Sequence, residues 1–211
     1  MINNKCKICR RLGQKLFLKG ERCFSSKCAM IKRAFPPGFE KKRKRKRSVF
    51  SGYKKAFNEK QKLRRWYGLS ERQFKQYVKK IMERHGKVQD IADELIKRLE
   101  KRLDNVIFRL GLAKSLTEAR QLVSHKYFLV NNKPINIPSF EVKKGDIITI
   151  KEGKKKKGIF REINSQLKKK EIPSWLEIDK DTLTGKIKEE PSLAQIIPPA
   201  EISTIFEFYS R

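Results

Sequence analysis

Four cysteines near the N-terminus are the residues whose type and spacing most directly indicate chemistry. Cys6 and Cys9 form a C-x2-C pair, and Cys23 and Cys28 form a C-x4-C pair thirteen residues later. Two close pairs of thiolates can supply the closed tetrahedral set of ligands that structural zinc prefers. The basic residues between the pairs favour metal binding, because nearby positive charge lowers the pKa of a thiol. We predict one structural zinc; an iron–sulfur cluster, which uses the same thiolates, and free thiols are the alternatives.

The two histidines give no indication of catalysis. Neither His85 nor His125 has a constellation of Ser, Cys or Asp around it, as nucleophilic catalysis would need. An RNA-modifying enzyme would also need a separate catalytic domain, and the chain has no room for one. We therefore predict that the protein is not an enzyme and takes no small-molecule substrate. His85 is interpreted as a helix-end residue and His125 as an RNA contact.

The charge balance indicates a polyanionic partner. Among 211 residues, 53 are Lys or Arg and 23 are Asp or Glu, which gives a net charge of +30. So large an excess would repel itself in a protein folded alone, whereas bound phosphates would neutralise it. A membrane is not expected, because the sequence has no long apolar run and no basic helix with a Trp or Phe face. It also has no secretory signal, so we expect a cytoplasmic protein whose cysteines bind metal rather than form disulfides.

Basic and hydrogen-bonding side chains gather in three stretches. Any single Lys or Arg is usually an ordinary solvated surface residue, and an uninterrupted basic run can be a disordered tail. We interpret the first stretch as an arm that orders along RNA phosphates, and the other two as parts of an RNA-binding surface. The candidate RNA-binding residues are Lys41, Lys42, Arg43, Lys44, Arg45, Lys46 and Arg47 in the arm; Lys62, Arg64, Arg65 and Arg72 in the second stretch; and Arg109, Lys114, Ser115, Arg120, Gln121, Ser124, His125, Lys126, Asn131 and Lys133 in the third.

The third stretch belongs to a unit of two helices and a small antiparallel sheet, residues 103–150. Apolar residues at helical spacing predict a first helix that ends at Gly111. Ser115 and Glu118 form a capping box that opens a second helix. The predicted strands are 128–130, 135–137 and 147–150, with a turn at 131–133. The second helix should bury Leu116, Ala119, Leu122 and Val123.

Helical patterns flank this unit on both sides. One helix is predicted over 53–68, and a second follows a capping box of Ser70 and Gln73. A third helix begins near Val88 and should expose Lys97, Arg98, Lys101 and Arg102. Beyond the unit we predict a basic loop at 154–157, a short helix ending at 167–170, a strand at 175–178 and a polar connection from Gly185. A last helix is predicted from apolar residues at 202, 205, 206 and 209. It is too short to be stable alone, so it must dock on the earlier helices. Glu201 and Glu207 would then face a protein neighbour.

The chain resembles the bacterial ribosomal small-subunit protein four family, in its cysteine-containing, zinc-binding form. The strings Arg102-Leu103-Asp104-Asn105, Arg109-Leu110-Gly111, Ala119-Arg120-Gln121-Leu122-Val123, Val130-Asn131 and Ile137-Pro138 resemble the RNA-binding domain named after that protein. The flanks match the family at Leu18-Lys19-Gly20-Glu21-Arg22-Cys23, Glu59-Lys60-Gln61-Lys62, Arg64-Arg65, Tyr67-Gly68, Glu71-Arg72-Gln73-Phe74, Pro173, Trp175-Leu176 and Glu207-Phe208-Tyr209-Ser210-Arg211.

We therefore predict an α+β fold in three parts. Residues 1–45 are a cysteine metal-binding knuckle and basic arm, an N-terminal metal-binding extension. Residues 46–100 and 185–211 form a mainly helical domain. Residues 101–184 form the inserted RNA-binding domain, whose core motif is 103–150. Two departures from the family stand out: the run 41–47 replaces a polar cluster, and a short segment before Cys6 is missing, so contacts there do not carry over.

The resemblance implies a structural component of the small ribosomal subunit that binds ribosomal RNA early, in the 5′ domain at a multi-helix junction. It implies small-subunit proteins five and three as neighbours, with messenger RNA at the entry channel as a further candidate partner. It also implies an influence on translational accuracy together with protein five. A small RNA-binding factor for stalled ribosomes is the alternative, although such a factor would need neither the cysteines nor the last helix.

Overall fold

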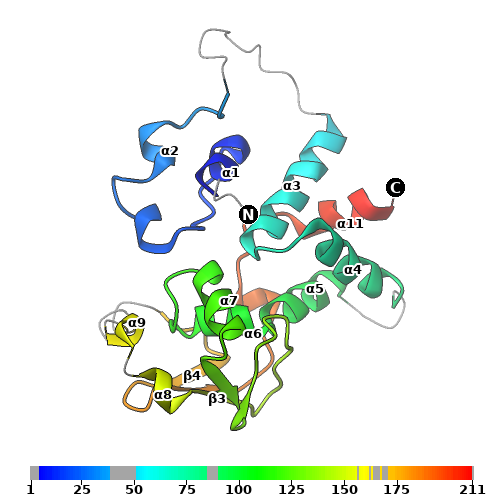
Figure 1. Cartoon of the computed structure of the whole chain (residues 1–211). Helices are drawn as coiled ribbons and strands as arrows, with labels where there is room; N and C mark the ends of the chain where they lie inside the picture. The colour runs from blue at the N-terminus through cyan, green and yellow to red at the C-terminus, as the bar shows by residue number, and fades with distance from the viewer. Residues whose placement is uncertain are drawn as a thin grey trace. The chain divides into compact units, whose positions relative to one another are not determined.

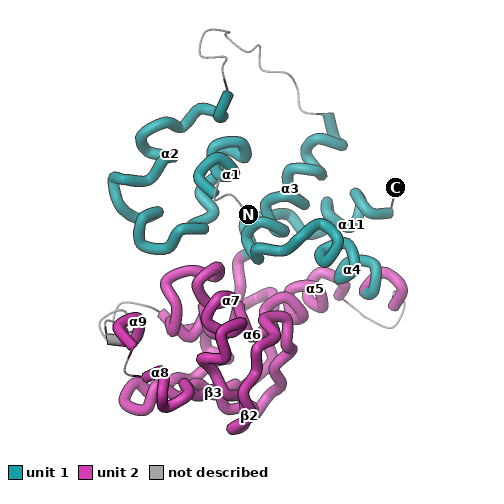
Figure 2. The backbone as a smooth tube through the Cα atoms, in the orientation of Figure 1, with its two compact units in different colours: residues 1–80, 198–211 teal, residues 81–197 magenta. Residues whose placement is uncertain are grey.

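The structure is a computed structural model that describes residues 5–38, 51–84, 90–155, 157–161, 163, 167 and 171–210. The chain forms two compact units, one of residues 1–80 and 198–211 and one of residues 81–197 (Figure 2). The predicted basic arm 41–47, His85 and Val88 lie outside the described residues, as do residues 168–170 of the predicted short helix. The predicted domain boundaries stay a prediction.

The cysteine-containing segment consists of short elements joined by loops (Figure 1). It contains the helices α1 (Lys5–Leu12) and α2 (Ala29–Lys32) and the 3₁₀ helix η1 (Gly20–Cys23). Phe17 and Gly20 have left-handed backbone conformations, with φ of 51° and 60°, and so turn the chain between the two cysteine pairs.

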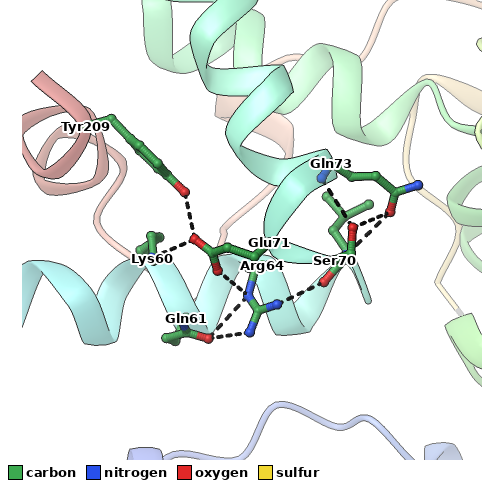
Figure 3. Close-up of polar contacts among 8 residues, drawn as sticks. Lys60, Gln61, Arg64, Ser70, Glu71, Gln73 and Tyr209 are labelled. Atoms are coloured by element: carbon green, nitrogen blue, oxygen red, sulfur yellow. Dashed lines mark hydrogen bonds and ion pairs between the residues drawn. The ribbon is translucent and has the colours of Figure 1, made fainter. Parts of the chain in front are cut away.

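The rest of the first unit is built from α3 (Gly52–Trp66), α4 (Glu71–Met82) and α11 (Ile202–Ser210). The Ser70–Gln73 capping box is confirmed: the Gln73 backbone N–H donates to Ser70 Oγ at 3.2 Å, and the Ser70 N–H donates to Gln73 Oε1 at 3.4 Å (Figure 3). The last helix docks as expected, since α11 packs along α3 with Ile202 and Ile205 buried. Glu201, however, does not face away from α3, because its carboxylate lies 3.5 Å from Lys55 Nζ.

A buried lysine connects α11 to the other two helices of this unit. Lys60 Nζ lies 4.4 Å from the ring centroid of Phe208 and 5.6 Å from that of Tyr209, and it donates to Glu71 Oε1 at 2.7 Å. The Tyr209 hydroxyl donates to the same oxygen at 3.1 Å (Figure 3). Burial, and then the adjacent Glu71 charge, raise the pKa of Tyr209, so its hydroxyl stays a donor at neutral pH. The cluster therefore joins α11 to α3 and α4 by both packing and charge.

The second unit begins with three helices, α5 (Ile91–Glu100), α6 (Leu103–Arg109) and α7 (Leu116–Ser124). Gly111, with φ of 84°, follows the end of α6, and the Glu118 N–H donates to Ser115 Oγ at 3.3 Å; both predicted helix boundaries are confirmed. The prediction that Arg102 is exposed is wrong: only 2% of its surface is accessible. It is the N-cap residue of α6, at a turn between two packed helices.

Five strands form one antiparallel sheet in the order β2-β1-β3-β5-β4. They are β1 (Phe128–Val130), β2 (Lys133–Pro134), β3 (Ile147–Ile150), β4 (Leu176–Asp179) and β5 (Thr184–Ile187). The strand predicted at 135–137 is wrong: β2 covers Lys133–Pro134, and Ile135 adds only a hydrogen bond from its N–H to the Phe128 carbonyl at 3.4 Å. The polar connection predicted from Gly185 is also wrong, because this glycine pairs with Ile148 and Ile178.

Three short elements complete the unit: α8 (Glu152–Lys155), α9 (Gly158–Arg161) and the 3₁₀ helix η2 (Leu193–Gln195). The basic loop predicted at 154–157 is therefore partly helical. One apolar core joins α6, α7 and the sheet, and Trp175 and Phe128 are among its largest fully buried side chains. The helix–helix–sheet prediction is thus confirmed, and β4 matches the strand predicted at 175–178, whereas β5 was not predicted. No described helix has the length and apolar character needed to cross a membrane.

Gly185 shows how tightly sheet and helix approach each other. A Cβ added at this position would lie 2.5 Å from Cδ1 of the fully buried Leu110. We expect Gly185→Ala to lower the free energy of unfolding by about 1–3 kcal/mol, because overpacking forces the core to shift. Thermal or denaturant unfolding measures this. Gly153→Ala is the matched control, since a Cβ there meets nothing within 4 Å; equal effects of the two substitutions would contradict the prediction.

Candidate nucleic-acid interface

The polar side of α7 carries most of the predicted RNA-binding residues of the second unit. Ala119, Leu122 and Val123 bury one side of the helix in the core, so the opposite side faces solvent. The helix ends at a left-handed residue, Lys126, with φ of 56°. Among the predicted RNA-binding residues on α7 and directly beside it, those that are exposed are Lys114, Gln121, Ser124, His125 and Lys126.

The tight turn between β1 and β2 contributes to the same set of candidates. Asn131 and Asn132 both have positive φ, 48° and 64°, and form the two-residue connection between paired Val130 and Lys133. The Asn131 side chain is already used in the fold: it donates to Asp146 Oδ1 at 2.9 Å and accepts from the Ile147 N–H at 3.0 Å. Lys133 is exposed immediately after the turn.

Arg120 of α7 is held by a buried carboxylate that the sequence analysis did not single out. Arg120 Nε and Nη2 donate to Asp104 Oδ2 at 3.0 and 2.8 Å. On its other side Asp104 accepts from Arg102, through Nε at 3.1 Å and Nη2 at 2.9 Å. Of the Asp104 side chain only 1% is exposed, whereas 32% of the Arg120 side chain is. Asp104 therefore lies between a buried arginine and a partly exposed one.

Arg109 has a similar arrangement with a second buried acid. Its Nε and Nη2 donate to the two carboxylate oxygens of Glu100, at 3.0 and 2.7 Å, and Asn105 also donates to that carboxylate. Glu100 is fully buried, and 21% of the Arg109 side chain is exposed. One signal could have revealed both acids: Glu100 and Asp104 each directly follow a leucine of the helical apolar pattern, in a chain where acids are scarce.

The first unit places its four candidate residues differently from one another. Arg65 and Arg72 are exposed. Lys62 is paired with Glu59 at 2.6 Å. Arg64 is buried, donating to Gln61 Oε1 at 2.6 Å and lying 3.2 Å from Glu71 (Figure 3). The structure thus gives Arg64 a role inside the fold, as it gives Ser115 the role of a helix cap, and their contacts with RNA stay predictions.

Two lysines outside the predicted set extend the basic face past the end of α7. Lys154 Nζ lies 5.0 Å and Lys157 Nζ 5.3 Å from the ring centroid of Tyr127. Tyr127 follows α7 and donates its N–H to the Leu122 carbonyl. Both ammonium groups therefore lie against the ring of Tyr127, the residue that directly follows the exposed His125 and Lys126.

The four cysteines surround one small cavity in the first unit. The cavity has a volume of about 20 Å³ and is lined by Cys6, Cys9, Cys23 and Cys28, together with Lys5 and Lys19. That volume is close to what one water-sized sphere occupies. The Lys19 N–H donates to Cys23 Sγ at 3.4 Å, as backbone amides often do to metal-bound thiolates.

The thiols are close enough to influence one another electrostatically. Burial, together with the neighbouring Cys23, Cys6 and Cys28, raises the pKa of Cys9, and a backbone hydrogen bond at Leu16 partly offsets this. Burial is the largest cause, and the shift of the Cys9 pKa is opposite in direction to the lowering expected from the basic surroundings. As they stand, no three His, Cys, Asp or Glu side chains among the described residues form a group that could hold a metal ion.

Comparison with known proteins covers the whole chain. Residues 1–103 match the family model of the ribosomal protein S4/S9 N-terminal domain, and residues 101–148 match that of the S4 domain. The chain is similar to small ribosomal subunit protein uS4 of Caldicellulosiruptor saccharolyticus, with 46% identity over 211 residues, 100% of this chain and 98% of the relative. It is 41% identical to the uS4 protein of Thermotoga petrophila and 43% identical to that of Syntrophomonas wolfei, each over 98% of this chain and 96% of the relative.

Proposed function

Since the chain belongs to the uS4 family of small ribosomal subunit proteins, we propose that it binds small-subunit ribosomal RNA through the exposed side of α7 and the β1–β2 turn. As a member of this family it is a structural ribosomal protein of the cytoplasm and not an enzyme. The main support for this binding face is that α7 buries its apolar side and turns its basic and polar residues toward solvent.

The mechanism of this function is assembly rather than catalysis. Junctions of RNA helices must be held at fixed angles against the repulsion between their phosphates. A rigid basic face can bridge such helices by recognising their shape and phosphates more than their base sequence. The apolar core under α6, α7 and the sheet supplies that rigidity. We place the target in the 5′ domain at a multi-helix junction, as the family resemblance implies.

Binding to a 5′-domain ribosomal RNA fragment at several salt concentrations tests the proposal. The log of the affinity should fall with log salt with a slope magnitude of at least about 5, because many counterions are released. Lys126→Ala should weaken binding and reduce that slope by about one unit. The control is Lys180→Ala, at an exposed lysine away from the proposed face, which should change little. A nearly flat salt dependence would contradict the proposed phosphate-dominated interface.

We further propose that the cysteine cavity holds one zinc ion. Its support is the convergence of all four thiols on a cavity of one-ion size. Zinc would favour the deprotonated form of each thiol, including the buried Cys9. An iron–sulfur cluster uses the same ligands and is the alternative. The zinc would be structural, fixing α1, η1 and α2 to one another.

We also propose that the α3–α11 pair contacts a protein neighbour, small-subunit protein five, and thereby influences translational accuracy; small-subunit protein three is a second proposed neighbour. A groove of about 220 Å³ between the two helices supports a protein contact there. It is lined by both acidic and aromatic side chains, including Glu207, Tyr53 and Phe208. Phosphates would be repelled by the acids, whereas a protein can use the exposed rings.

A further inference from the structure

We propose that the buried carboxylate of Asp104 is a positioning residue that strengthens RNA binding, although it carries a negative charge. It would do so by holding the guanidinium of Arg120 in a fixed orientation on the exposed side of α7. Glu100 would act on Arg109 in the same way. The inference rests on the proposed RNA-binding face, and it assigns a role to residues that are themselves inaccessible to RNA.

The first step of the argument is how Asp104 is placed. Its backbone N–H donates to the Pro138 carbonyl at 3.1 Å, in the first turn of α6. The main chain at Asp104 is therefore held from both sides, by the helix and by this contact. Arg102, of whose side chain 3% is exposed, donates to both oxygens of this carboxylate. This inner arginine offsets the cost of burying the negative charge.

The second step is the charge that reaches the surface. One carboxylate contacts two guanidinium groups, so the three side chains together carry a charge of +1. The inner guanidinium is buried and the outer one, Arg120, is one-third exposed. Of the two guanidinium groups, that of Arg120 is therefore the one that reaches the surface, beside Gln121 and Ser124 on the exposed side of α7. In the Glu100–Arg109 pair the two charges cancel. This pair would therefore orient the Arg109 guanidinium without adding net charge to the surface.

The third step is the cost of ordering an arginine. A free arginine side chain samples many rotamers, which it must give up when it binds a phosphate. Arg120 uses Nε and Nη2 together on one carboxylate oxygen, and this fixes the plane of its guanidinium before RNA arrives. A side chain that is already ordered loses less entropy on binding, and its affinity for the phosphate is correspondingly higher.

This role and simple electrostatics predict opposite results for Asp104→Asn. Removing an acid beside an RNA-binding surface should tighten binding if charge alone matters, because the protein becomes more positive. If Asp104 positions Arg120, the same substitution should weaken binding instead. A lysine in place of Arg120 separates the two effects further, since it keeps the charge but cannot form the two-donor contact with Asp104.

The experiment measures the affinity of the full-length protein for a 5′-domain ribosomal RNA fragment, with thermal unfolding followed alongside. We expect Asp104→Asn and Arg120→Ala each to weaken binding by roughly tenfold. In protein that already carries Arg120→Ala, adding Asp104→Asn should have little further effect. Unchanged or tighter RNA binding by Asp104→Asn would overturn the proposal. So would an equal loss of affinity when Asp104→Asn is added to the wild type and to Arg120→Ala, because that would indicate general damage to the fold.

Arg120→Lys decides the question if Asp104→Asn does not fold. Because Arg120 is partly exposed, this substitution leaves the buried Arg102–Asp104 pair in place. We expect it to weaken binding nearly as much as Arg120→Ala, and wild-type affinity would overturn the proposal. Lys126→Ala tests the proposed RNA-binding face separately from the positioning role. If this variant binds RNA like the wild type, the face itself is wrong. If it binds RNA more weakly while the Asp104 and Arg120 variants bind normally, only the positioning role is rejected.

Discussion

Cys9→Ser is expected to abolish binding of the proposed zinc ion and to unfold the segment of residues 5–38. Cys9 is buried and lines the cavity together with the other three cysteines, so its sulfur cannot be replaced by a neighbouring ligand. Binding of structural zinc contributes about 10–16 kcal/mol in small zinc-dependent peptides, so its loss should outweigh every other change considered for this segment. The remaining apolar burial is small: Leu16 is the only fully buried large side chain of this part among the described residues.

Elemental analysis of the purified protein should find one zinc per chain, and Cys9→Ser should lose most of it. Limited proteolysis should then cut within residues 5–38 while the RNA-binding unit stays intact, because that unit has a core of its own. Ser26→Ala, at an exposed position between Cys23 and Cys28, is the matched control and should keep its zinc. A brown protein containing iron and sulfide would reject zinc in favour of a cluster, and metal-free protein would reject the site.

Truncation after Ala200 is expected to leave RNA binding in place but to raise misreading. It removes α11, and with it the rings of Phe208 and Tyr209 that cover Lys60. The proposed contact with protein five would loosen, and in our hypothesis that contact is present only in the open form of the small subunit. Weakening it would then make closure around a near-matched codon easier. A loss of about 1.4 kcal/mol would shift the equilibrium about tenfold.

A near-cognate reporter in cells carrying the truncated protein measures this effect, with ribosome content determined in parallel. Tyr209→Phe is the milder matched variant, because it keeps the ring on Lys60 and removes only the hydrogen bond to Glu71. It should cost about 0.5–1.5 kcal/mol in the docking of α11 and change misreading less than the truncation does. Unchanged or improved accuracy in ribosomes that contain the truncated protein would contradict the hypothesis. Failure of those ribosomes to assemble would show instead that α11 is needed for folding.

The helices and their ends could be predicted because their signals are local. The Ser70–Gln73 and Ser115–Glu118 capping boxes and the left-handed Gly111 act within one or two turns of chain, where side-chain type determines backbone conformation. The Asn131–Asn132 turn was predictable for the same reason, since asparagine tolerates positive φ. The predictions of an RNA partner, from the charge excess, and of a metal site, from the cysteine spacing, likewise needed no knowledge of contacts between distant residues.

Contacts between residues far apart in the chain could be decided only by the tertiary structure. Gly185 looks like a chain breaker in sequence, yet it pairs within a strand, at a position where an added Cβ would lie 2.5 Å from Leu110 Cδ1. Arg102 and Arg120 look equally basic, but one is buried and the other one-third exposed. That difference arises because Asp104 lies between them, 16 residues from Arg120 in sequence. Residue type determined which side chains could pair, and the packing of α6 against α7 determined which of them remained at the surface.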